Sequence, residues 1–107
     1  MKKRGQIWWA NFDPSIGQEI KKQRPAVIIS NNLSNKYLNR YQVVPISSQT
    51  GKLYPSETIV MINGEEGKAM ADQITRVSEQ RFVNKFGKVT SMELENIENV
   101  IRLQLDL

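Results

Sequence analysis

The segment Arg24-Pro25-Ala26-Val27-Ile28-Ile29 places an arginine at the start of a short apolar run. A run of this length and composition is typical of a buried β-strand. Proline disfavours the helical conformation in the residue before it, so we expect Arg24 to be extended and to leave the sheet edge in a defined direction. The guanidinium cannot lose its proton in a protein. The sequence therefore predicts a permanent cation at the mouth of a buried strand.

A second apolar run, Val43-Val44-Pro45-Ile46, ends in the hydroxyl pair Ser47-Ser48. An arginine and a hydroxyl at the ends of two strands indicate a site for phosphate. Together with these two strands, predicted over residues 24–30 and 41–47, alternating or β-branched patterns predict further strands. These cover residues 6–12, 58–62, 69–77 and 86–89, and one short helical turn is expected within residues 31–39.

Residues 90–105 are predicted to form a helix. Thr90 and Glu93 fit a capping box at its start, and apolar residues then recur at helical spacing. Five or more strands followed by one helix indicate an α+β, mainly β domain, a small and partly open barrel closed by the C-terminal helix. The residues expected in its core are Val27, Ile29, Val44, Ile46, Ile59, Met61, Ile74, Leu94, Ile97 and Ile101.

The composition limits the possible functions. The 107 residues fit a single domain, 1–107, and no apolar stretch approaches the roughly 18 residues that a membrane span needs. The chain has no cysteine and no histidine, so disulfides and thiol chemistry are excluded and a zinc site is not expected. The missing cysteines are compatible with a reducing cytoplasm, where we expect this protein, and no cofactor is expected.

Positive charge is concentrated in the first part of the chain. Residues 1–60 contain nine Lys and Arg against three Asp and Glu, a net charge of +6, whereas residues 61–107 contain six against eight, a net charge of −2. This distribution favours a polyanionic partner, although lysine-rich loops that only keep a domain soluble explain it equally well. Together with the predicted arginine–hydroxyl site, the charge distribution favours nucleic acid as the partner.

Five short motifs occur in order along the chain: Arg4-Gly5-Gln6-Ile7-Trp8, Asp13-Pro14-Ser15-Ile16-Gly17-Gln18-Glu19, Arg24-Pro25-Ala26-Val27, Val44-Pro45-Ile46-Ser47-Ser48 and Asp72-Gln73-Ile74. None is specific alone. Their order and spacing resemble the MazF/PemK-type toxins of bacterial toxin–antitoxin pairs, from Arg4 to the last helix. The resemblance implies the small SH3-like barrel shared by the CcdB and PemK toxins.

The resemblance also implies an activity. Members of this family are homodimeric mRNA interferases, which cut single-stranded RNA at short sequences without a metal. The ribose 2′-hydroxyl attacks the adjacent phosphate and leaves a 2′,3′-cyclic phosphate and a 5′-hydroxyl. A cognate, MazE-like antitoxin places a disordered acidic segment over the RNA groove.

By position, Arg24 and Ser47 match the family's catalytic arginine and hydroxyl, although threonine is more usual than serine. Ser48 is the neighbour that can substitute for Ser47. Glu19 and Asp72 match carboxylates proposed as general base in different members. Glu19 is explained equally well as a charge in a solvated loop, and Asp72 is explained better as a structural carboxylate in a strand. The general base is therefore left open between them.

The remaining candidates are residues for RNA binding. Trp8 is placed to stack a base, although one ring of the Trp8-Trp9 pair is expected in the core. Tyr54 is a candidate to hold a base, and lysines in two polar loops would contact phosphates without reading sequence. The residues of these loops that we assign to RNA binding are Gln18, Lys21, Lys22, Gln49, Lys52 and Tyr54.

Two other functions remain open at this stage. A non-catalytic inhibitor of DNA gyrase, as in the CcdB toxins, has the same fold, but the chain ends in Arg102-Leu103-Gln104-Leu105-Asp106-Leu107 and lacks the tryptophan–glycine pair that those toxins use. A family member that binds RNA without cutting it is the second alternative. The sequence does not identify the RNA recognition word.

Overall fold

The computed structural model describes residues 2–12 and 23–107. It contains seven strands, arranged as one antiparallel sheet in the order β4-β5-β3-β2-β1-β7, with β6 paired to β3. The strands are β1 (Gln6–Asn11), β2 (Gln23–Ile28), β3 (Arg40–Ser47), β4 (Glu57–Ile62), β5 (Glu65–Met70), β6 (Thr75–Ser78) and β7 (Phe82–Lys88). The other elements are α1 (Asn32–Tyr37), α2 (Ser91–Leu105) and the 3-10 turns η1 (Ala71–Gln73) and η2 (Glu79–Arg81).

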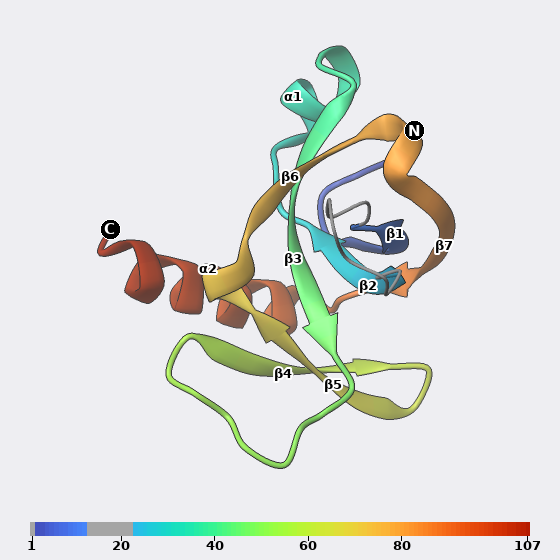
Figure 1. Cartoon of the computed structure of the whole chain (residues 1–107). Helices are drawn as coiled ribbons and strands as arrows, with labels where there is room; N and C mark the ends of the chain where they lie inside the picture. Colours follow the sequence, from blue (N-terminus) through green and yellow to red (C-terminus); the bar gives the residue numbers. More distant parts are fainter. Residues whose placement is uncertain (1, 13–22) are drawn as a thin grey trace, which may run out of the picture.

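The sheet curls into a partly open barrel, and α2 packs beside β4 and η1 (Figure 1). This arrangement confirms the expected mainly β fold with a C-terminal helix. In the described part of the chain, no helix is both long and apolar enough to cross a membrane.

The helix α2 begins where the capping box predicts. The Thr90 hydroxyl accepts a hydrogen bond from the Glu93 N–H at 3.1 Å, and the Glu93 carboxylate accepts one from the Thr90 N–H at 2.9 Å. These bonds satisfy two backbone donors that the first turn leaves without helical partners. Ile97 is fully buried under the sheet, and Leu94 and Ile101 pack beside it.

The core has two parts, on opposite faces of the curled sheet. The larger part, beneath α2, contains the buried residues Ile7, Val27, Val44, Ile46, Val60, Ile62, Ala69, Val89 and Ile97. The smaller part contains Ala26, Ile28, Tyr41, Val43 and Val77, with Trp8, Phe12 and Phe82 packed against it. Neighbouring residues of β1 and β2 therefore serve different parts of the core.

The inward face of β4 differs from the sequence prediction. Val60 is fully buried and Ile62 is 9% exposed, whereas Met61, expected in the core, is 47% exposed. The continuous apolar run Ile59-Val60-Met61-Ile62 gives no alternation from which to choose a face. The turn decides instead: Asn63 and Gly64 both have positive φ, and the tight hairpin pairs Ile62 with Glu65.

The single strand expected over residues 69–77 is broken. Its first residues end β5, Ala71–Gln73 forms the turn η1, and the chain resumes as β6. β3 pairs with β5 at residues 46–47 and with β6 at residues 40–43, so the chain must turn a corner between the two pairings. Asp72 consequently lies exposed on that corner rather than within a strand.

Candidate active site

The arginine and the hydroxyl that were predicted to form one site do line a single cleft. Arg24, near the start of β2, and Ser47, at the end of β3, both line a cavity of about 410 Å³. Ser48 also borders it, and a cavity of this size falls within the roughly 300–1,000 Å³ of small-ligand sites. The sequence placed these residues at the ends of two strands, and the antiparallel pairing of β2 with β3 brings them to one cleft.

Arg24 is positioned by the pairing of β2. On one side Arg24 pairs with Ala10 and Pro25 with Trp9 of β1, while β3 begins its pairing only at Ala26. Arg24 therefore lies just beyond the β2–β3 ladder, at the edge of the cleft that it lines. Within residues 2–12 and 23–107, the Arg24 guanidinium forms no ion pair and no hydrogen bond.

The Ser47 hydroxyl is held in an orientation that suits a donor. Ser47 is 9% exposed, and its Oγ accepts a hydrogen bond from the Gln49 N–H at 3.1 Å. A serine hydroxyl has one hydrogen and two acceptor lone pairs. Because the bond to Gln49 uses a lone pair, the hydrogen is available to an oxygen in the cleft.

Gly67 keeps the floor of the cleft low beside Ser47. A Cβ added at Gly67 would lie 2.6 Å from Ile46 Cγ2 and 3.4 Å from the Ser47 carbonyl oxygen. Any larger residue would push β5 away from β3 or fill the space at their junction. The glycine thus permits the close strand approach on which the site depends.

Glu65 enters the cleft from the β4–β5 hairpin. It pairs with Ile62, and both residues line the cavity. Glu65 is not among the site residues expected from the sequence, because the strand predicted there ends at residue 62 and no returning strand was expected beside it. The residues Asn63-Gly64 are a strong hairpin signal, from which a returning strand beside β4 follows.

The two tryptophans lie on opposite faces of β1. Trp9 lines the cleft with Phe86, their ring centres 5.3 Å apart and their planes tilted by 41°. Trp8 instead packs edge-on against Phe82 in the smaller core, at 5.9 Å. The structure therefore places Trp8, our candidate for base stacking, away from the cleft and places Trp9 in it.

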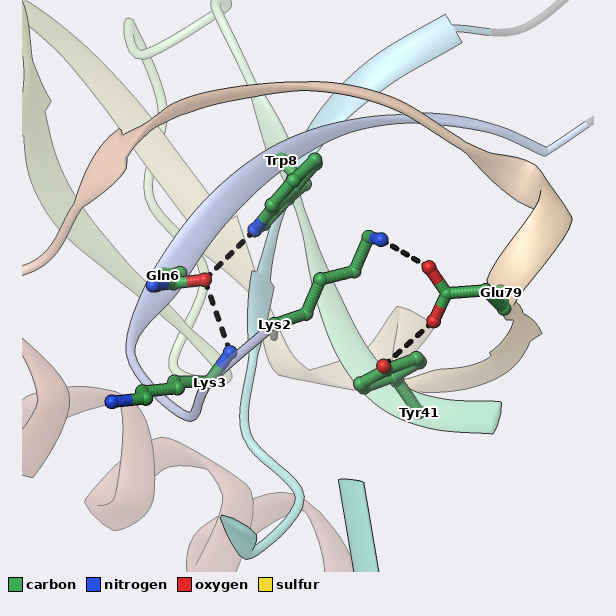
Figure 2. A network of polar contacts seen from close by, with 6 residues as sticks. All are labelled: Lys2, Lys3, Gln6, Trp8, Tyr41 and Glu79. Carbon is green, nitrogen blue, oxygen red and sulfur yellow. Dashed lines mark hydrogen bonds and ion pairs between the residues drawn. The ribbon is translucent and has the colours of Figure 1, made fainter. Parts of the chain in front are cut away.

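A network of polar contacts surrounds Trp8 on its face of β1, as Figure 2 shows. The Lys2 ammonium lies 4.5 Å from the Trp8 ring centre and is paired with the Glu79 carboxylate, which also accepts a 2.7 Å hydrogen bond from the Tyr41 hydroxyl. The hydrogen bond from Lys2 lowers the pKa of Glu79. Burial, aided by Glu79, raises the pKa of Tyr41 to about 12.

The loop after Ser48 lies outside the cleft wall but is anchored near it. Lys68, which pairs with Ser47 across the β3–β5 ladder, forms a 3.2 Å ion pair with buried Glu57 and donates to the Lys52 carbonyl at 3.0 Å. Lys52 and Lys68 both lie over the half-exposed Tyr54 ring, at 5.0 and 5.8 Å. Gln49, Lys52 and Tyr54 therefore flank the cleft without lining it.

Other expected site residues are placed differently or lie outside the described chain. Asp72 does not line the cleft. Gln18, Glu19, Lys21 and Lys22 fall outside the described residues. In residues 2–12 and 23–107, there is no group of three or more His, Cys, Asp or Glu side chains that could hold a metal ion.

The curled sheet, its closing helix and the cleft at the ends of β2 and β3 define a small β-barrel domain whose cleft is lined by an arginine and a serine. Residues 3–105 match the family described as the PemK-like, MazF-like toxin of type II toxin–antitoxin systems, and the chain belongs to this family. The resemblance noted in the sequence is thereby confirmed.

Two curated relatives support this assignment. The chain is 34% identical over 116 residues to endoribonuclease MazF9 of Mycobacterium tuberculosis, covering 100% of this chain and 98% of the relative. It is 33% identical over 100 residues to the endoribonuclease toxin MazF of Escherichia coli K12, covering 92% of this chain and 89% of the relative.

Solved structures confirm the fold. MazF of Deinococcus radiodurans superposes with a TM-score of 0.82 at 23% identity, over 99% of this chain and 97% of that one. A mycobacterial endoribonuclease in complex with its cognate antitoxin gives a TM-score of 0.81 at 22% identity, over 100% and 97%.

Proposed function

We propose that this chain is a toxin endoribonuclease that cleaves single-stranded mRNA at a short sequence and so blocks translation and growth. No metal takes part. The ribose 2′-hydroxyl attacks the adjacent phosphate, leaving a 2′,3′-cyclic phosphate and a 5′-hydroxyl. The observation that carries this proposal is the meeting of Arg24 and Ser47 in one cleft beside the aromatic rings of Trp9 and Phe86.

Arg24 stabilises the charge that develops on phosphorus. In-line attack produces a pentacoordinate phosphorus with anionic oxygens, and a forked guanidinium pairs two of them at once. Because Arg24 has no described protein partner, its donors are available to the substrate. Its permanent charge makes it a poor general acid, so its role is electrostatic.

Ser47 donates a hydrogen bond to a non-bridging phosphate oxygen. Its hydroxyl hydrogen is left free by the bond that its oxygen accepts from Gln49. Ser47 is not a covalent nucleophile in this scheme: the chain has no histidine to activate it, and RNA supplies its own 2′-hydroxyl.

Glu19 is the general base in this proposal. Of the two carboxylates suggested by the resemblance, Asp72 is exposed on η1 and does not line the cleft. A base must come within hydrogen-bond reach of the proton that it removes. The position of Asp72 favours a structural role, which leaves Glu19 for the chemistry.

RNA approaches across the cleft and the loop that flanks it. Trp9 and Phe86 offer aromatic surface to a base, and Tyr54 offers a second, outer ring. Lys52 beside Tyr54, with Lys21 and Lys22, supplies phosphate contacts that do not depend on sequence. Association is expected to weaken steeply as salt rises, because it releases counterions.

We further propose a homodimer that acts in the cytoplasm and is inhibited by a cognate antitoxin. Two half-grooves joined by a two-fold axis would hold several nucleotides. An acidic, flexible antitoxin segment would enter the groove that RNA needs, so peptide and RNA should compete. Sedimentation across concentration, followed by RNA titration with the acidic peptide present, tests both points; a monomer, or simultaneous binding, would contradict them.

A cleavage assay on purified protein tests the activity. End-labelled single-stranded RNA should be cut equally with and without EDTA, and the products should end in a 2′,3′-cyclic phosphate and a 5′-hydroxyl. Binding without cleavage would identify an inactive RNA-binding member. Absence of both, with inhibition of DNA gyrase, would identify a gyrase inhibitor of the same fold.

A further inference from the structure

The cleft carries a negative charge opposite its positive one. Glu65 lines the cavity from the β4–β5 hairpin, whereas Arg24 and Ser47 line it from the ends of β2 and β3. Register places the Glu65 side chain on the same face as Ile62, the face that contains the larger core. Gly67, two residues later on that face, also lines the cavity, and a Cβ there would lie 2.6 Å from Ile46 Cγ2.

Glu65 is not neutralised by the described protein. Within residues 2–12 and 23–107, it forms no ion pair and no hydrogen bond. The other hairpin carboxylate, Glu66, also lines the cavity, but it pairs with Met61, whose side chain is 47% exposed, whereas Glu65 pairs with buried Ile62. Of the two, Glu65 is therefore the carboxylate on the inward face of the hairpin.

The opposite charges orient a nucleotide. A phosphate is attracted to Arg24 and repelled by Glu65, so the backbone must lie toward Arg24 and Ser47. The base then extends toward the hairpin, with the rings of Trp9 and Phe86 at the same cavity. An ionised carboxylate accepts hydrogen bonds and donates none, so it favours a base edge that carries N–H donors.

We propose that Glu65 is a specificity residue that selects a base with an exocyclic amino group next to the scissile phosphate and rejects uracil. Adenine, cytosine and guanine all present such a donor, and guanine sets its N1–H beside its amino group, so both carboxylate oxygens can be used. Uracil presents carbonyl oxygens on both sides of its single N3–H, and these face the carboxylate unfavourably. The inference rests on the proposed RNA substrate.

The test compares matched RNA oligonucleotides. Fragment-end sequencing with the wild-type protein first locates the cleaved bond. Oligonucleotides with each of the four bases at the flanking positions are then compared in cleavage rate and in equilibrium binding. At one position, we expect the wild type to disfavour uridine by about tenfold to a hundredfold, the scale of one well-formed carboxylate–base contact.

The variant Glu65→Gln should lose most of that discrimination. A glutamine amide offers both a donor and an acceptor, so it can pair with the O4 of uracil as well as with an amino group. Activity on uridine-containing RNA should rise relative to wild type while the preferred RNA is still bound. Glu95→Gln, which changes the same charge on the exposed face of α2, is the control and should keep the wild-type preference.

The possible outcomes separate the proposal about Glu65 from the proposed nuclease activity. If Glu65→Gln is folded, binds RNA and keeps the wild-type base profile, the inference about Glu65 is wrong and the proposed nuclease is unaffected. If the wild type binds but does not cut, the nuclease proposal fails, and the binding series still decides whether Glu65 reads the base. If no RNA is bound, both proposals fall together.

Discussion

Trp8 and Trp9 are neighbours in the sequence and belong to two different regions of the molecule. On the Trp8 face, the charged groups are paired with one another: Lys2 with Glu79, and Glu79 with Tyr41 (Figure 2). In the cleft that Trp9 lines, Arg24 and Glu65 have no partner among the described residues. Charges that the protein satisfies itself contribute to folding, whereas charges left to a ligand contribute to function.

The comparison predicts that substitutions on the two faces will separate activity from stability. Removing a charge that has no partner among the described residues is expected to cost little folding free energy, because no described interaction is lost. Removing one member of the paired face breaks a contact that exists in the folded state. The predictions below are ordered from the largest expected effect to the smallest.

The largest effect is expected for Arg24→Ala. We expect RNA cleavage to fall by about 10²–10³-fold, the scale of losing one preorganised donor to the transition state. The free energy of unfolding should change by less than about 0.5 kcal/mol, as for other surface changes. Single-turnover cleavage and urea unfolding measure the two quantities.

Arg24→Lys and Arg76→Ala sharpen this prediction. Lysine keeps the charge but loses the fork, so it should restore little activity. Arg76 is an exposed arginine on β6 outside the cleft, and its loss should leave the rate nearly unchanged. A lysine variant that cleaves at close to the wild-type rate would remove the argument for two-oxygen pairing.

The two tryptophans should respond in opposite ways. Trp9→Ala should weaken RNA binding by about tenfold, as expected for losing one stacked base, worth roughly 1–3 kcal/mol. Trp8→Ala should leave RNA affinity nearly unchanged and lower the free energy of unfolding by about 2 kcal/mol, because Trp8 is only partly buried. Fluorescence anisotropy measures the RNA affinity and urea unfolding measures the stability. A loss of RNA affinity in Trp8→Ala but not in Trp9→Ala would contradict the prediction.

The smallest effect concerns Glu79 and pH. Its pKa is lowered from 4.5 by Lys2, so the pair stabilises the fold above that pH and loses its contribution as pH falls through the folded-state pKa. Glu79→Gln should therefore cost about 1 kcal/mol or less near pH 7, because the side chain is 41% exposed, and less still near pH 3. A cost that grows toward pH 3 would show that the contribution of the Lys2–Glu79 pair to stability changes with pH in the opposite direction.

Much of the fold follows from local sequence. The Arg24–Ile29 and Val43–Ile46 runs mark β2 and β3, and the Thr90–Glu93 capping box marks the start of α2. Each signal is a property of adjacent residues, and each element begins within about a residue of the prediction. The positions of Arg24 and Ser47 at the ends of two strands were also predictable, whereas their meeting in one cleft depends on the antiparallel pairing of β2 with β3.

The failures arise where long-range pairing overrides local pattern. The apolar run of β4 has no alternation, so the hairpin turn fixes which of Val60 and Met61 is buried. Asp72 leaves the expected strand because β3 must pair with two partners in succession. Glu65 became visible as a cleft residue only once the hairpin was folded back along β3.

The central claim is that the Arg24 cleft cuts RNA by using the 2′-hydroxyl of the substrate. One measurement tests it most directly: cleavage, in EDTA, of an RNA oligonucleotide with a single 2′-deoxy substitution at the ribose before the scissile phosphate. We expect this oligonucleotide to bind as tightly as the unmodified RNA, to within about twofold, and to remain uncut. Cleavage at the substituted position would show that water or Ser47 is the nucleophile, and would contradict the account.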